Sequence, residues 1–301
     1  MLHAVFIPAE RASIPNITED NELLTANALS SATWSAALCL GASLGGFVVS
    51  AYGVEAAFII NAVCFLLGAL MYSTLTIPQE PFVPKTGGIW ANTGGNIVDG
   101  FRIIFSKPHV SRIITAKALW AVFGGGLVYM LILIGDEIAF GDLAAGIGIL
   151  FAARGLGTGL GPIFARYVFK DRNIWPFLLG SLVSVCGVAY VIIGFLEWTP
   201  WIAVIVVMGH AASAINWVLS TVLLQERSED EWRGRLFSTD FLLMTTVNGC
   251  STLVASLMLE YTDVTLRQGI QLFAVLQVAS GIIWVMLMLP RERRYLQATS
   301  S

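Results

Sequence analysis

The chain has 301 residues, of which 56% are hydrophobic and only 12% are charged, and its mean hydropathy is +0.76. Soluble domains use about 25% charged residues, so this composition excludes a soluble globular protein and predicts a membrane protein in contact with the lipid bilayer. The net charge is only -3, and no basic cluster with interleaved aromatic residues indicates a nucleic-acid partner.

Eight apolar stretches follow one another along the chain. An α-helix rises about 1.5 Å per residue, so about 20 apolar residues cross a hydrocarbon core of about 30 Å. We therefore predict an all-α fold, a polytopic membrane protein with eight transmembrane helices. The predicted spans are Ala28–Val49, Ala56–Leu75, Ile113–Gly135, Leu143–Val168, Ile174–Leu196, Trp201–Leu223, Leu236–Leu259 and Gly269–Leu289.

The connections between these spans alternate between basic and acidic. Of the 17 Lys and Arg residues, all but three fall in one set of connections, and the opposite set holds only Arg267. The opposite set instead carries carboxylates such as Glu55, Asp142 and Glu260. Because cytoplasmic loops carry an excess of Lys and Arg, we expect a multi-pass protein of the cell (plasma or inner) membrane with both termini in the cytoplasm.

The widest connection follows the second span. Three prolines and two glycine pairs punctuate it between residues 77 and 107, which is typical of a linker. Its last part carries apolar residues at helical spacing, which predicts a short amphipathic helix. That helix lies either on the membrane surface or against the rest of the protein. The apolar residues concerned are Ile97, Phe101, Ile104 and Phe105.

Four local patterns carry a family resemblance. The first is Phe6–Pro15 followed by Leu24–Leu29, the second is G-A-S-L-G-G from Gly41 to Gly46, the third is Arg154–Pro162, and the fourth is R-G-R from Arg233 to Arg235. Together they resemble the major facilitator superfamily, in particular its bacterial drug, macrolide and siderophore exporters. The second pattern is similar to the antiporter signature G-P-x-x-G-G, with alanine in place of the proline.

The resemblance implies a domain organisation. The family fold has twelve helices in two halves, with the substrate path between them, and the eight spans would be equivalent to helices 5–12. Residues 1–76 would then hold the end of helix 4 with helices 5 and 6, and residues 77–112 the cytoplasmic linker with its amphipathic helix. Residues 113–290 would form a complete six-helix C-terminal half, and residues 291–301 a cytoplasmic tail. The first three to four helices would be missing.

Small residues gather in two of the spans. In lipid the hydrophobic drive between helices is absent, so close helix packing depends on small residues. The same faces serve static packing equally well as the sliding or rocking that a transporter needs. The helix-packing residues we single out are Gly41, Gly45, Gly46, Gly155, Gly159 and Gly161.

Two ionisable side chains near the middle of spans are candidates for the substrate or ion pathway. Charged groups at membrane depth are costly and mark functional sites by default. Arg154 would bind an anionic group or pair with a carboxylate, and the alternative is a structural arginine bonded to carbonyl groups. His210 titrates near neutral pH and would carry a coupled proton, and the alternative is a structural hydrogen-bonding histidine.

Further pathway candidates are polar residues elsewhere in the spans. Lys117 lies one turn inside its span and is expected to snorkel toward the headgroups. Asp240 is expected to pair with a basic neighbour such as Arg233 or Arg235. Polar amides at depth line a path or bond across helices. They are Asn61, Asn216 and Asn248.

The sequence contains no pattern of an enzyme. It has no H-E-x-x-H, nucleotide-binding loop or G-x-S-x-G pattern, and its four cysteines form no C-x-x-C pair. We therefore expect no catalytic residue, no metal and no cofactor, and an ion gradient as the energy source. The first hypothesis is a secondary transporter that exports small amphipathic molecules by proton antiport. The second is a truncated, non-transporting remnant or a membrane interaction subunit, which requires a separate chain to supply the missing helices.

Overall fold

The computed structural model describes residues 2–19, 21–76, 89–138 and 143–300, and every regular element in these ranges is a helix. The predicted all-α fold is therefore confirmed. The elements are α1 (Leu2–Ile17), α2 (Leu23–Ser73), α3 (Ile89–Ser106), α4 (Pro108–Glu137), α5 (Leu143–Val168), the short 3-10 helix η1 (Arg172–Ile174), α6 (Trp175–Phe195), α7 (Ile202–Glu226), α8 (Asp230–Tyr261) and α9 (Leu266–Ser300).

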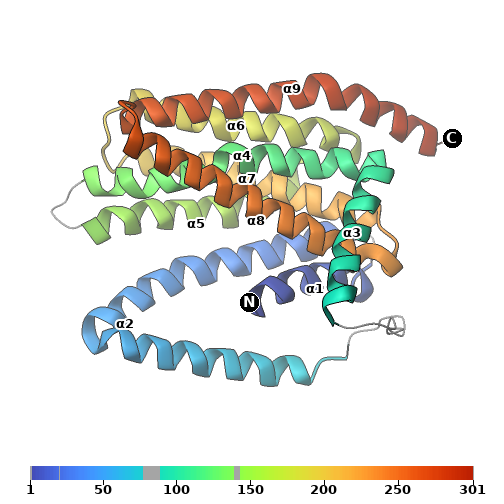
Figure 1. The fold of residues 1–301 in the computed structure, drawn as a ribbon, viewed down its shortest axis with the longest axis horizontal. Helices are drawn as coiled ribbons and strands as arrows, with labels where there is room; N and C mark the ends of the chain where they lie inside the picture. Colours follow the sequence, from blue (N-terminus) through green and yellow to red (C-terminus); the bar gives the residue numbers. More distant parts are fainter. Residues whose placement is uncertain (1, 20, 77–88, 139–142, 301) are drawn as a thin grey trace.

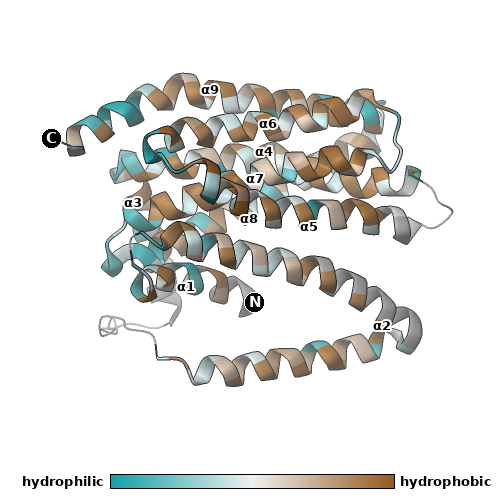
Figure 2. Cartoon of the chain, turned by 180° about the vertical axis from the view of Figure 1, so that it is seen from behind, coloured by the Kyte–Doolittle hydropathy of each residue, from teal (hydrophilic) through white to brown (hydrophobic). Residues whose placement is uncertain are grey.

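Within the described residues, seven helical segments are long and apolar enough to cross a membrane. They are Tyr52–Ser73, Pro108–Gly135, Gly146–Val168, Arg172–Phe195, Ile202–Glu226, Asp230–Tyr261 and Leu266–Ala298. Hydrophobic residues run along these helices, and hydrophilic residues gather toward their ends (Figure 2). The polytopic membrane protein predicted from the sequence is confirmed. The predicted span Ala28–Val49 is helical within α2 but is not among the seven, so its membrane crossing stays a prediction.

Helices α4 to α9 form one bundle, in which α6 packs on α9, α5 on α7 and α4 on α8 (Figure 1). Two apolar clusters fill its interior. One contains Trp175, Leu219 and Trp284, and the other contains Leu127 and Ile193, all buried. We call the end of the bundle that carries α3 and the C-terminal part of α9 the charged end (right in Figure 1).

Glycines allow the backbones of the paired helices to come into direct contact. A Cβ added at Gly161 would lie 2.5 Å from the Ala211 carbonyl oxygen of α7, and one added at Gly125 of α4 would lie 2.4 Å from the Asn248 carbonyl oxygen of α8. Real Cβ atoms do not approach this closely, so only glycine fits. This is the close approach that helix pairs in lipid achieve through small residues.

Two glycine-to-alanine substitutions in α5 should differ in their effect on stability. Gly161→Ala forces α5 away from Ala211 and should lower the unfolding free energy by about 1–3 kcal/mol, as overpacking does. Gly148→Ala meets open space, because nothing lies within 4 Å of its added Cβ, and should be neutral or stabilising by about 0.4–1 kcal/mol. Thermal unfolding of both purified variants in detergent checks this, and an equal shift in the two would contradict the packing described.

Helix α2 consists of two arms that meet at Gly53. This residue has φ 84° and ψ 169°, a conformation open essentially only to glycine, and it is the one positive φ among the described residues. The first arm packs on α5 and α7. The second arm lies apart from the bundle (Figure 1), and no residue of its apolar window is buried.

Helix α3 crosses the charged end of the bundle (Figure 1). Its Gly100 packs against Arg235 and Thr239 of α8, and its Ile104 is buried. Phe105 is 78% exposed. The sequence allowed α3 to lie either against the protein or on the membrane surface. The structure shows that it contacts the protein, while the exposed Phe105 stays free to contact a membrane surface. At the other boundary, α9 continues as a helix to Ser300, so the predicted tail begins inside a helix.

Candidate functional site

A buried ion pair joins α4 to α8. Lys117 Nζ lies 2.8 Å from Asp240 Oδ2, and the two side chains are 0% and 1% exposed. The expectation that Lys117 snorkels is therefore wrong, and so is the expected pairing of Asp240 with Arg233 or Arg235. The physical reason is that α4 and α8 pack with these two positions facing each other, which leaves the amine inside the bundle.

The two arginines instead hold partners nearer the end of α8. Arg233 donates to Asp230 at 3.2 Å and to Asn16 Oδ1 of α1 at 2.9 Å. Arg235 pairs with Asp99 of α3 at 3.5 Å. Both arginines thus connect α8 to short helices at the charged end and do not reach the buried carboxylate.

Trp217 of α7 brings a second cation to the ion pair. Lys117 Nζ lies 4.7 Å from the centroid of a Trp217 ring, and Arg11 Cζ of α1 lies 4.4 Å from one, which are cation–π distances. The second carboxylate oxygen of Asp240, Oδ1, is buried and has no hydrogen-bond partner. One carboxylate therefore faces two cations around a single indole.

Polar contacts fix α1 and the start of α2 against α7. The Gln225 side chain of α7 donates from Nε2 to the Arg11 carbonyl oxygen at 2.9 Å, and it accepts at Oε1 from Asn27 Nδ2 at 2.6 Å. Arg11 and Asn27 of this network thus come from residues 1–76, and Gln225 comes from the bundle. The two parts that the sequence analysis assigned to different halves meet at the buried ion pair.

The first arm of α2 contacts α5 near the middle of α5 and then leaves it. Ser35 Oγ donates to Thr158 Oγ1 at 2.9 Å, and Gly159 packs against the same serine. Farther along the arm, an added Cβ at Gly41 would meet nothing within 4 Å, and Leu44 is 63% exposed. The two helices therefore diverge toward the turn of α2, as Figure 1 shows.

A second polar cluster lies deeper in the bundle, around His210. The His210 ring is buried and its Nε2 is 2.9 Å from the Tyr190 hydroxyl of α6. The half-buried Arg154 of α5 belongs to this neighbourhood. Its Nε is buried without a hydrogen-bond partner, and none of the ion pairs found in the described part of the chain includes it. The sequence prediction of a pairing carboxylate for Arg154 therefore has no counterpart there.

The other predicted pathway residues are spread over the molecule. Asn216 is 2% exposed and its Oδ1 lacks a partner, whereas Asn248 packs beside Gly125. Asn61 is exposed on the second arm of α2, outside the bundle. The structure thus gathers Lys117 with Asp240, and Arg154 with His210, and leaves Asn61 apart.

The predicted packing glycines differ in their surroundings. Gly155 is buried, and Gly159 and Gly161 approach α2 and α7 respectively. Gly45 and Gly46 fall in the part of α2 whose side-chain environment lies outside the described residues. The small residues of α5 thus pack on two different neighbours.

Sequence reasoning missed a charged cluster at the end of α9. Glu292 is 1% exposed and accepts from Arg112 Nε at 2.6 Å and from Arg227 of α7 at 2.9 Å. Tyr295 lies beneath both guanidinium groups. The signal available was the single acidic residue in the run R-E-R-R, but its basic neighbours were interpreted only as orientation charges.

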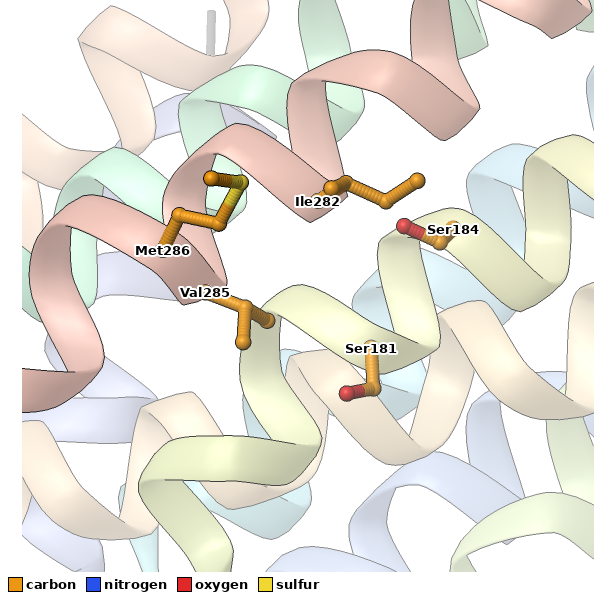
Figure 3. A pocket seen from close by; sticks show the side chains of 5 residues that line it. All are labelled: Ser181, Ser184, Ile282, Val285 and Met286. Carbon is orange, nitrogen blue, oxygen red and sulfur yellow. The ribbon is translucent and has the colours of Figure 1, made fainter.

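A shallow hollow of about 220 Å³ lies between α6 and α9 (Figure 3). It is lined by Ser181, Ser184, Ile282, Val285 and Met286. Both serine hydroxyls donate to backbone carbonyl groups, of Phe177 and Val278. The hollow therefore presents an apolar surface without an ionisable group, and it is separate from the two polar clusters.

Ionisable groups at membrane depth mark ion and substrate pathways. Apolar helices that enclose the Lys117–Asp240 pair and Arg154 therefore indicate a membrane transporter. The chain belongs to the Major Facilitator Superfamily, whose family model matches residues 1–245. It is also similar to the uncharacterized MFS-type transporter YkuC of Bacillus subtilis (strain 168), with 23% identity over 197 residues. The match covers 63% of this chain and 45% of that relative, so the chain spans less than half the length of the curated relative it matches.

Proposed function

We propose that the protein is a secondary transporter that exports small amphipathic molecules in exchange for protons, by alternating access. The observation that carries this proposal is the buried pair of Lys117 and Asp240 with Arg11 beside it. A carboxylate buried inside a membrane protein is a candidate for carrying a coupled proton. Family membership supports the transporter class, and the buried ion pair supports the proposed coupling of export to proton movement.

Protonation of Asp240 changes the balance of forces at this site. With the carboxylate ionised, its charge holds Lys117 on α4 and attracts Arg11 on α1. With the carboxylate neutral, Arg11 and Lys117 lie at the Trp217 indole without a counter-charge. The two cations then repel each other strongly, because the dielectric constant inside the bundle is low. The proton therefore favours separation of α1 from α7 and α8, and its release favours their contact.

The arrangement of α1 and α2 supports one end state of such a cycle. Their contacts with α7 and α8 lie near the charged end, and the first arm of α2 diverges from α5 toward the other end (Figure 1). If the charged end is cytoplasmic, as the excess of Lys and Arg predicts, this is the outward-open state. Protonation from outside would then start the return to the inward-open state.

Reconstitution of the full chain into liposomes tests this proposal. The probes are ethidium and 1-naphthaleneacetate, which are amphipathic molecules of opposite charge. An imposed pH gradient should drive accumulation of at least one probe, and dissipating the gradient with a protonophore should abolish it. Equal accumulation with and without the gradient, or no accumulation above that of empty liposomes, would contradict proton antiport.

A second proposal is a membrane subunit that pairs with another chain through the second arm of α2. The observation that favours it is the exposure of this arm, on which Phe58 is 70% and Leu66 is 65% exposed. Cys64 lies exposed on the same arm and offers a cross-linking site. A thiol-specific cross-linker in native membranes should then join the chain to one defined partner, and Cys64→Ser should abolish the adduct. Lipid contact alone gives no such adduct.

A further inference from the structure

We propose that Arg154 binds the carboxylate of an amphipathic organic anion, and that Trp120 and the Tyr190–His210 pair complete its polar surroundings. The inference rests on the proposed transport function and names the substrate class that the same protein would carry. It uses a part of the bundle distinct from the Lys117–Asp240 pair.

Arg154 is a cation without a counter-ion in the described part of the chain. Three other largely buried cations of the bundle each have a carboxylate within 3 Å, namely Lys117, Arg112 and Arg227. The Arg154 guanidinium lies 5.5 Å from the Phe151 ring, and its Nε makes no hydrogen bond. An arginine at membrane depth is costly unless it is paired, so an anionic ligand would relieve a cost that the protein alone leaves uncompensated.

The neighbouring side chains add polar atoms of the right kind. Trp120 of α4 and Gln277 of α9 flank the Cys186 thiol, and Arg154 also lies near that sulfur. The Trp120 Nε1–H is buried with only the weakly accepting Cys186 sulfur beside it, so it can still donate to a stronger acceptor. Unsatisfied buried polar groups are uncommon in native proteins and call for an explanation. A ligand carboxylate would accept from the arginine and from the indole.

A route to Arg154 exists on the α2 side of α5. Arg154 lies one helical turn from Thr158, so the two share a face of α5. Thr158 contacts α2 through Ser35, and the helices diverge beyond that contact in the direction of Arg154. Part of the Arg154 side chain is accordingly exposed. An anion entering between α5 and the first arm of α2 would meet the guanidinium one turn past the Ser35–Thr158 contact.

The chemistry of guanidinium selects a carboxylate over its neutral analogue. Arginine presents a planar fork that matches a carboxylate with two parallel hydrogen bonds, whereas an amide offers one acceptor and no charge. Hydrogen bonds to charged groups contribute about 1.5–3 kcal/mol, which corresponds to about tenfold to a hundredfold in affinity. The expected preference for acid over amide is therefore at least about tenfold.

Equilibrium dialysis of the purified full chain in nanodiscs tests this site. The probes are 1-naphthaleneacetate and 1-naphthaleneacetamide, which share the ring and differ in charge. Wild-type protein should bind the acid at least about tenfold more tightly than the amide. Arg154→Gln should abolish the preference, and Arg154→Lys should keep part of it. The matched control is Arg267→Gln, since Arg267 donates to the Gly194 and Leu196 carbonyl groups at the end of α6; it should leave the preference unchanged.

Each outcome bears on the inference separately from the transport proposal. Equal affinity of wild-type protein for acid and amide overturns the inference, and so does an unchanged preference in Arg154→Gln. If Arg154→Gln does not fold, the wild-type comparison and Arg154→Lys still decide. A preserved acid preference in a protein that shows no gradient-driven flux would refute the transport proposal alone. Coupled flux without an acid preference would refute only the Arg154 site.

Discussion

Asp240→Asn should lower the stability of the protein by about 3–5 kcal/mol, because it leaves Lys117 as an uncompensated buried charge. The Lys117 side chain is fully buried, so water cannot replace the lost carboxylate. The asparagine is nearly isosteric, which separates the loss of charge from a loss of packing. Thermal unfolding in detergent, with size-exclusion chromatography to detect aggregation, measures the effect.

The matched controls define what the buried charge contributes. Asp230→Asn removes the exposed partner of Arg233 on the same helix and should change stability by less than about 1 kcal/mol. The double variant Lys117→Met/Asp240→Leu replaces both charges with apolar groups and should recover most of the lost stability, as apolar replacements of buried ion pairs do elsewhere. A double variant as unstable as Asp240→Asn would mean that the pair does not act through its charge.

Glu292→Gln should lower stability by about 3 kcal/mol, because it leaves two arginines side by side without their shared carboxylate. Arg112 and Arg227 are 12% and 8% exposed, so some water reaches them and the effect should be smaller than at Asp240. The substitution loosens α9 from α4 and α7 at the charged end. Hydrogen exchange of the α9 residues after Met288, compared between variant and wild type, measures that loosening.

Glu231→Gln is the control for this second substitution. Glu231 is also a carboxylate paired with an arginine, Arg235, but at 4.0 Å and with its side chain 82% exposed. Exposed pairs contribute about 0–1 kcal/mol, so this variant should unfold like wild type. A similar loss of stability in Glu292→Gln and Glu231→Gln would show that burial of Glu292 is not the reason for its contribution to stability.

The helices were predictable because apolar length alone specifies a span in lipid, whereas their mutual contacts were not. Lys117 and Asp240 are 123 residues apart, and nothing in a uniformly apolar helix tells which side faces a neighbour. Position in the chain suggested that Lys117 could snorkel and that Asp240 had nearby arginines. Only the packing of α4 on α8 shows that the two side chains point at each other.

The ends of helices were harder to predict for a different reason. The residues after Leu289 are expected to form a cytoplasmic tail. In the structure α9 continues as a helix to Ser300, and its Glu292 pairs with two arginines from neighbouring helices. In α3 the apolar periodicity was correct but could not distinguish lipid from protein contact. Gly100 and the ion pair between Asp99 and Arg235 decide that α3 packs on α8.

Gradient-driven flux through the Lys117→Met/Asp240→Leu variant tests the central claim most directly. The variant is expected to fold and to bind its probe as wild type does, and to lose accumulation driven by the pH gradient in liposomes. Downhill movement of the probe without a gradient should persist. If the double variant accumulates the probe against its gradient as fast as wild type does, proton coupling does not pass through the Lys117–Asp240 pair.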